Sequence, residues 1–167
     1  MFYDQGADLR AGHIGIRYWF ENDAGEAFTE SGVAPGGNYT LHIRGNTGAY
    51  ISIWDVERGI ELMSRGALSG GILLNSGQEL AVPDIFEFAA DAPARRIIIV
   101  WGRSQSEQAG SVAGAEARLR ELTPRMGRDG ALQIVRESDD VTPGQTGTYV
   151  INREGMPLAT EIVLRSP

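Results

Sequence analysis

The 167-residue sequence contains no cysteine and no lysine. Without cysteine, a disulfide framework, a thiolate metal site and a cysteine nucleophile are all excluded. Without lysine, a phosphate-binding loop that ends in Gly-Lys-Ser or Gly-Lys-Thr cannot be completed. All 15 basic residues are arginines, and the 22 acidic residues leave a formal net charge of −7. We therefore expect no nucleic-acid partner, because affinity for phosphates comes from clustered cations.

Long hydrophobic runs are also missing. No apolar stretch approaches the roughly 20 residues that cross a bilayer, so we expect no membrane span. The opening "MFYDQGADLR" has no basic segment followed by an apolar one, and we expect no signal peptide. Neither observation decides between the cytoplasm and the cell envelope as the compartment. The length and the hydrophobic content of 42% fit one folded domain, which we assign to residues 1–167.

Strand patterns dominate the sequence that remains. "IGIRYWF" (14–20), "NYTLHIR" (38–44) and "AYISIWDV" (49–56) alternate between aliphatic and other residues, as strands with two different faces do. The polar link Gly45–Gly48 between the last two predicts a hairpin. "IIIVW" (97–101) is continuously apolar, which predicts a central strand buried on both faces. "ALQIVRE", "TGTYVIN" and "ATEIVLR" predict three more strands.

One helix is expected late in the chain, within "SVAGAEARLRELTP" (111–124). Its apolar residues Ala115, Leu119 and Leu122 recur at helical spacing, and Ser111 is a candidate N-cap. The predicted fold class is mainly β, a single domain resembling an antiparallel β-sandwich with one short helix.

Residues that could support catalysis are few. His42 is one of only two histidines, and its alternating strand position predicts an exposed side chain. A Ser52–His42–Asp55 triad can be written down, but no G-x-S-x-G elbow accompanies it, and triads are defined by geometry. We therefore assign no catalytic residue, no metal ligand and no cofactor. The acidic pair Asp139–Asp140 lies in a Thr-Pro-Gly loop where solvated carboxylates are common.

Three aromatic residues form the other candidate site. Trp19, Tyr50 and Trp54 all lie opposite the aliphatic faces of their strands. If that second face is exposed, they are a platform for a sugar or peptide, with His42 nearby. If a second sheet or the helix covers it, they are core residues. We favour the core interpretation, because a sandwich needs large side chains on its covered faces.

The order of several segments resembles the bacterial family known as domain of unknown function 4384. The segments that carry this resemblance span about residues 15–165: "GIRYWF", "GGNYTLHIRGNTGAYISIW", "LAVPDIFEF", "IIIVWGR", "TGTYVIN" and "EIVLR". The resemblance implies a non-catalytic β-sandwich module. Such modules accompany caspase-like peptidases, protein kinases or repeat scaffolds, or occur on envelope lipoproteins.

These observations give three functional hypotheses. The first is a non-enzymatic accessory domain that binds a protein partner or a neighbouring domain, such as a caspase-like peptidase, a kinase or an envelope component, by strand addition at a sheet edge. The second is a glycan-binding module that uses Trp19, Tyr50 and Trp54. The third is a hydrolase centred on His42.

Overall fold

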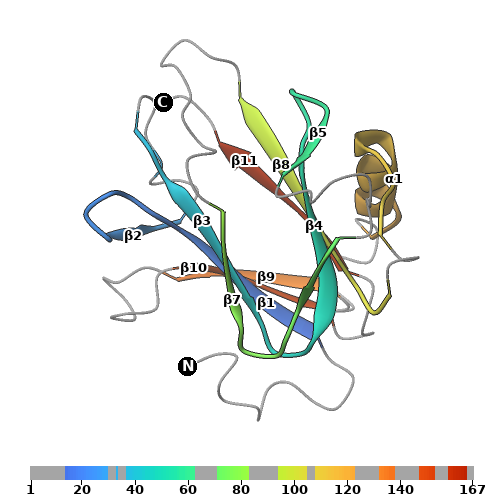
Figure 1. Ribbon diagram of the computed structural model, residues 1–167, viewed down its shortest axis with the longest axis horizontal. Coiled ribbons are helices and arrows are strands. Elements are labelled where there is room, and N and C mark those ends of the chain that lie inside the picture. Colours follow the sequence, from blue (N-terminus) through green and yellow to red (C-terminus); the bar gives the residue numbers. More distant parts are fainter. Residues whose placement is uncertain are drawn as a thin grey trace.

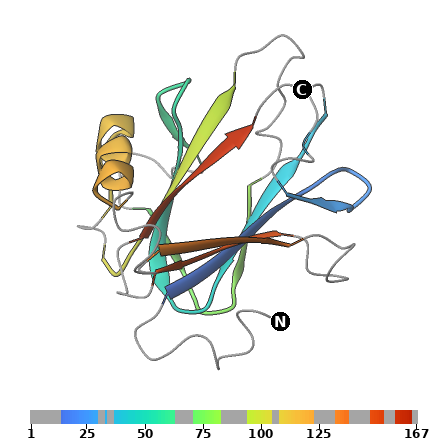
Figure 2. The same cartoon turned by 180° about the vertical axis from the view of Figure 1, so that it is seen from behind.

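The computed structural model describes residues 14–29, 33, 37–62, 71–82, 94–104, 108–122, 132–137, 147–152 and 158–164. The strands in these ranges form two antiparallel sheets, and one helix flanks the second sheet (Figures 1 and 2). The mainly-β sandwich-like fold with a single late helix, expected from the sequence, is confirmed for the described residues.

Sheet A has the strand order β7-β3-β1-β10-β9, with β2 paired to β1. Sheet B has the order β11-β8-β4-β5, with β6 paired to β4. The strands of sheet A are β1 (Ile14–Glu21), β2 (Ala27–Phe28), β3 (Thr40–Gly45), β7 (Glu79–Val82), β9 (Leu132–Glu137) and β10 (Gly147–Asn152). Those of sheet B are β4 (Ala49–Asp55), β5 (Ile60–Leu62), β6 (Ile72–Leu74), β8 (Arg95–Gly102) and β11 (Leu158–Leu164).

The core lies between the two sheets and is built from the alternating faces that the sequence predicts. Sheet A contributes Ile16, Tyr18 and Phe20 from β1, which are at most 1% exposed. Leu41 and Ile43 of β3 lie beside them in antiparallel register. Sheet B contributes residues of the same kind: Ile51, Ile53, Ile97, Ile99, Trp101, Leu158, Ile162 and Leu164. Period-two alternation therefore determines which side chains exclude water.

One expectation about connectivity was wrong. The link Gly45–Gly48 does not close a hairpin, because β3 belongs to sheet A and β4 to sheet B. The chain instead crosses from one sheet to the other, and Asn46 fixes the crossing. Its backbone N–H donates to Gly15 O (3.0 Å), and its Oδ1 accepts from Gly15 N–H (2.8 Å). Alternating strands on either side of a glycine-containing link fit both connections equally well, so the sequence pattern does not separate them.

The predicted central strand is confirmed. β8 pairs with β11 on one side and β4 on the other, and Ile97–Trp101 are fully buried. At the start of this strand, the guanidinium of Arg95 donates to Asp55 Oδ2 through Nη2 (2.6 Å) and Nε (3.2 Å). Asp55 is completely buried and also accepts the backbone N–H of Arg58 (3.1 Å). The end of β4 thus carries a buried ion pair inside the sandwich.

Helix α1 (Val112–Leu122) covers the outer face of sheet B, where it contacts β11, β8 and β4 (Figure 1). Ser111 caps the helix as expected: its Oγ accepts from Gly114 N–H (3.0 Å), and its carbonyl accepts from Ala115 N–H (2.9 Å). Arg96 of β8 binds Glu116 of the helix (2.9 Å) and Glu161 of β11 (2.6 Å). The pKa of Arg96 is raised, first by its hydrogen bond to Glu161 and second by its hydrogen bond to Glu116. Helix α1 is therefore held against sheet B by apolar contacts and by the ion pair between Arg96 and Glu116.

Candidate functional site

The four residues singled out from the sequence lie on two different sheets. Trp19 and His42 lie on the outer face of sheet A, whereas Tyr50 and Trp54 lie on the outer face of sheet B. Trp19 is 6% exposed and Trp54 is 4% exposed. The three aromatic residues therefore do not form one platform. Both tryptophans are buried on outer faces and not between the sheets; Trp54 belongs to the hydrophobic core cluster, whereas Trp19 lies outside it.

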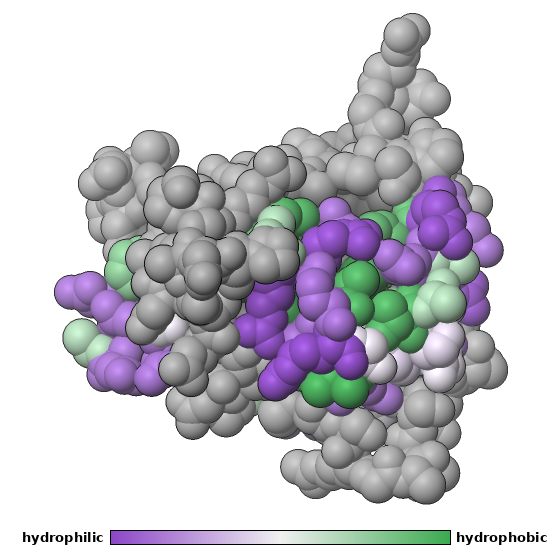
Figure 3. Space-filling view, turned by 90° about the horizontal axis from the view of Figure 1, so that it is seen from above, coloured by the Kyte–Doolittle hydropathy of each residue, from purple (hydrophilic) through white to green (hydrophobic). Residues whose placement is uncertain are grey.

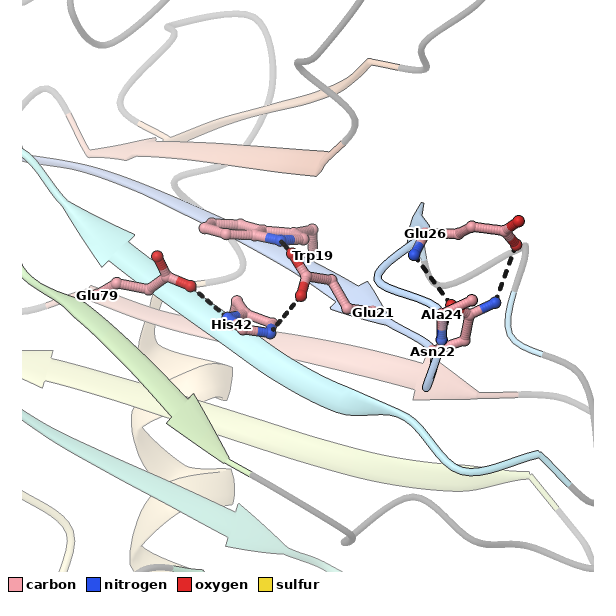
Figure 4. Close-up of polar contacts among 7 residues, drawn as sticks. All are labelled: Trp19, Glu21, Asn22, Ala24, Glu26, His42 and Glu79. Atoms are coloured by element: carbon pink, nitrogen blue, oxygen red, sulfur yellow. Dashed lines mark hydrogen bonds and ion pairs between the residues drawn. The ribbon is translucent and has the colours of Figure 1, made fainter.

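Trp19 and His42 belong to what we call the His42 cluster, namely Trp19, Glu21, His42 and Glu79 (Figure 4). The imidazole stacks on the Trp19 indole, with ring centroids 5.2 Å apart and planes 12° apart. His42 Nε2 lies 3.1 Å from Glu21 Oε2, and Nδ1 contacts Glu79 Oε1. Glu21 also accepts the Trp19 indole N–H (3.1 Å). The His42 side chain is only 13% exposed, so the expectation of an exposed histidine was wrong.

The position of these residues follows from strand register. Trp19 of β1 lies directly opposite His42 of β3, and His42 lies opposite Ala81 of β7. Glu21 and Glu79 each sit two residues from a direct partner of His42, on the same face of the sheet. The cluster therefore joins three adjacent strands through one imidazole ring.

This geometry is a poor basis for catalysis by His42. Both ring nitrogens face carboxylate oxygens, so neither is left to accept a proton from a nucleophile. A neutral imidazole has one N–H, and only the doubly protonated ring satisfies both contacts as hydrogen bonds. Ser52 and Asp55 lie in the other sheet, on opposite faces of β4, so the Ser52–His42–Asp55 triad is not assembled.

Trp54 is anchored in a buried polar network beneath the start of α1. Its indole N–H donates to Ser52 Oγ (3.0 Å), and Ser52 Oγ donates to Gln108 Oε1 (2.5 Å). Gln108 Nε2 in turn donates to the backbone carbonyl of Tyr50 (2.8 Å). The network satisfies each of these polar groups, which is what a structural role requires. Trp54 is therefore not available as an exposed stacking surface.

A second surface, which the sequence did not indicate, lies at the edge of sheet B. β5 and β6 both pair with β4, one after the other along the same side. β5 and β6 have three residues each, and together they lie opposite six of the seven residues of β4. Ser52 is the β4 residue that lies between the two segments. We call residues 60–62 and 72–74 the composite edge. Within the described strands, β4 is the only neighbour of either segment.

The composite edge carries the large hydrophobic residues that are most exposed to solvent. Among the described residues, Leu73 (57% exposed) and Ile60 (43%) are the two exposed large hydrophobics, and they lie on β6 and β5. Seen from above, hydrophobic residues emerge between hydrophilic ones on the side where β5 and α1 lie (Figure 3). Apolar residues concentrated at a sheet edge are typical of a contact surface.

Glu61 lies between these two hydrophobic residues on the composite edge, directly opposite Trp54. It is half-buried, and burial raises the pKa of its carboxyl above the ordinary value. No hydrogen bond or ion pair links the Glu61 side chain to any other residue in the described ranges. The sequence shows "GIEL" and "GGILL" only as short apolar pieces between glycines, so the pairing of both with one strand could not have been predicted.

Over the part of the chain that the structure describes, no three histidine, aspartate or glutamate residues are placed to hold a metal ion. Within the same ranges, no helix is long and apolar enough to span a membrane. Asp139 and Asp140 lie outside the described residues. Comparison with family models, curated proteins and solved structures finds no match for this chain.

Proposed function

We propose that this chain is a non-catalytic interaction module that binds a partner protein by strand addition at the composite edge of sheet B. The observation that carries the proposal is that the two exposed large hydrophobic residues among those described, Leu73 and Ile60, both lie on the short strands of one sheet edge, one on each face of the sheet. An edge strand offers unpaired backbone groups, and alternate side chains beside it provide specificity.

The arrangement of the rest of the molecule supports this role. The helix covers the β11, β8 and β4 part of sheet B, so the composite edge lies beside the helix and not beneath it (Figure 1). Both short strands are supported by β4, whose inner face is part of the core. A rigid support keeps the entropic cost of docking low. The resemblance to domain of unknown function 4384 implies the same kind of role.

The test is a selection of binding peptides from a displayed library of random 12-residue sequences. Selected peptides are measured for affinity, and amide hydrogen exchange of the domain is compared with and without peptide. We expect bound peptides to slow exchange at 60–62 and 72–74. Leu73→Thr should weaken binding about tenfold, since an apolar contact at an interface centre contributes of the order of 1–2 kcal/mol.

Val163→Thr is the matched control, because Val163 is a partly buried residue on β11, at the other edge of the same sheet. It introduces the same residue by replacing one methyl group with a hydroxyl and should leave peptide affinity unchanged. Slowed exchange at β11 instead, or failure to select any peptide that protects the composite edge, would show that the proposed function is wrong.

A further inference from the structure

We propose that the composite edge recognises an extended segment of a partner protein in which an arginine or lysine and a large apolar residue are four positions apart. This inference rests on the proposed function and specifies the chemistry of the partner. Two observations carry it independently, the strand register of the edge and the charge of Glu61.

The register sets the spacing. Glu61 lies opposite Trp54 and Leu73 lies opposite Tyr50, and these two positions of β4 are four residues apart. Side chains four apart in a strand point to the same face, so Glu61 and Leu73 project on the same side of sheet B. A strand added to the composite edge places its own residues opposite both, and they must also be four apart. The spacing holds for a parallel or an antiparallel partner strand.

The charge of the partner residue opposite Glu61 follows from how the other buried carboxylates of the domain are paired. Among the described residues, five carboxylates are partly or fully buried, and four of them have a hydrogen-bonded or ionic partner: Glu21, Asp55, Glu116 and Glu161. Glu61 is the fifth. A desolvated carboxylate without a cation is unfavourable, and a cationic side chain placed beside it restores the missing interaction. The composite edge therefore favours a basic residue across from Glu61.

The second position calls for an apolar residue. Leu73 is more than half exposed, and its cross-strand neighbour Tyr50 is partly buried on the same face. A large apolar side chain opposite Leu73 would remove that surface from water. The net charge of −7 further disfavours an acidic partner segment.

The experiment uses the same random 12-residue library, selected in parallel against the parent protein, Glu61→Lys and Asp23→Lys. Asp23 is an exposed carboxylate in the β1–β2 turn of sheet A, so its variant makes the same change of charge away from the edge. We expect peptides from the parent to be enriched in arginine or lysine four positions from an apolar residue. Glu61→Lys should weaken their binding about tenfold or more and should select an acidic residue at the basic position.

Asp23→Lys should leave both the affinity and the enriched pattern unchanged. If it weakens binding as much as Glu61→Lys does, the effect is general electrostatics and the inference is wrong. Peptides that protect the composite edge but show no basic residue at this spacing would also overturn the inference while leaving the proposed function intact. Failure to protect the edge at all would overturn both.

A second measurement needs no protein variant. In a selected peptide, alanine at the basic position should weaken binding to the parent protein about tenfold, whereas alanine at the next position along the peptide, which points to the opposite face, should not. Equal losses at both positions would contradict the proposed pairing with Glu61.

Discussion

The indole of Trp101 leaves no room for a side chain at position 45. A Cβ atom on Gly45 would lie 2.3 Å from the Trp101 ring, far inside van der Waals contact. We therefore expect Gly45→Ala to lower the free energy of unfolding by about 1–3 kcal/mol, because ring and backbone must both shift. Urea unfolding followed by tryptophan fluorescence measures this difference.

Gly48→Ala is the matched control, since its Cβ would meet the nearest atom at an ordinary 3.6 Å. It should change stability by about 0.5 kcal/mol or less. In a Trp101→Leu background the cost of Gly45→Ala should shrink. An equal cost with and without the indole would mean that backbone conformation, and not the contact with Trp101, explains the glycine.

A second single residue, Glu61, gives a prediction about how the stability of the domain depends on pH. Burial raises the pKa of its carboxyl in the folded chain. A carboxyl whose pKa is higher when folded binds its proton more tightly when folded, so its contribution to stability is complete at low pH and is lost as the pH rises through the folded value. Replacing Glu61 with glutamine removes this pH-dependent loss of stability. The stability of Glu61→Gln relative to the parent should therefore increase between about pH 4 and pH 7.

Thermal or urea unfolding at several pH values measures this trend, and Asp23→Asn, at an exposed carboxylate, serves as the control variant. The sign is the informative part of the result. A Glu61→Gln protein that loses relative stability as the pH rises would show that the carboxylate has a favourable partner in the folded chain.

At the level of elements, the His42 cluster joins β7 to the rest of sheet A. His42 contacts Glu21 on β1 and Glu79 on β7, and β7 has only four residues. We expect His42→Ala to leave the Glu79 carboxylate without its contact to the imidazole and to let the short strand fray. Amide hydrogen exchange at 79–82 should accelerate, while exchange in β1 and β10 stays within twofold of the parent, since local opening need not involve the whole sheet.

His42→Gln is the control for this prediction, because an amide can still donate to one carboxylate and should restore part of the protection. Uniform acceleration throughout sheet A would instead indicate that His42 stabilises the domain globally.

Sequence patterns predicted the elements better than their arrangement. The alternation in 14–20 and 38–44 identified which residues of β1 and β3 are buried, and the apolar run at 97–101 identified the central strand. Local alternation carries no information on which sheet a strand joins. For that reason the crossing at 45–48 was predicted as a hairpin, and Trp19 and Trp54 were assigned to one face. The composite edge depends on pairing between segments separated in sequence, which no local pattern reveals.

At the scale of the whole molecule, the buried ion pair of Asp55 and Arg95 gives a prediction about stability. Asp55 is fully buried, and Arg95 approaches it to 2.6 Å. Arg95→Met should cost about 3–5 kcal/mol, because the buried carboxylate of Asp55 then keeps only the more distant Arg58 (3.9 Å) as a cation. Asp55→Asn combined with Arg95→Met should recover part of this loss, since the uncompensated charge is removed. Urea unfolding of the parent, both single variants and the double variant measures the coupling, and strictly additive costs would contradict it.

The pairing of β1 with β10 has a consequence for how the domain is made. Ile16 lies opposite Val150, so β1, the middle strand of sheet A, pairs on one side with a strand that is translated more than a hundred residues later. Sheet B likewise acquires β11 only at the end, beside β8. Structures dominated by such distant pairings fold on the order of milliseconds to seconds, more slowly than helical domains. During synthesis β1 and β8 therefore emerge from the ribosome well before β10 and β11, the strands that complete their pairing, and one edge of each strand stays unpaired in the meantime.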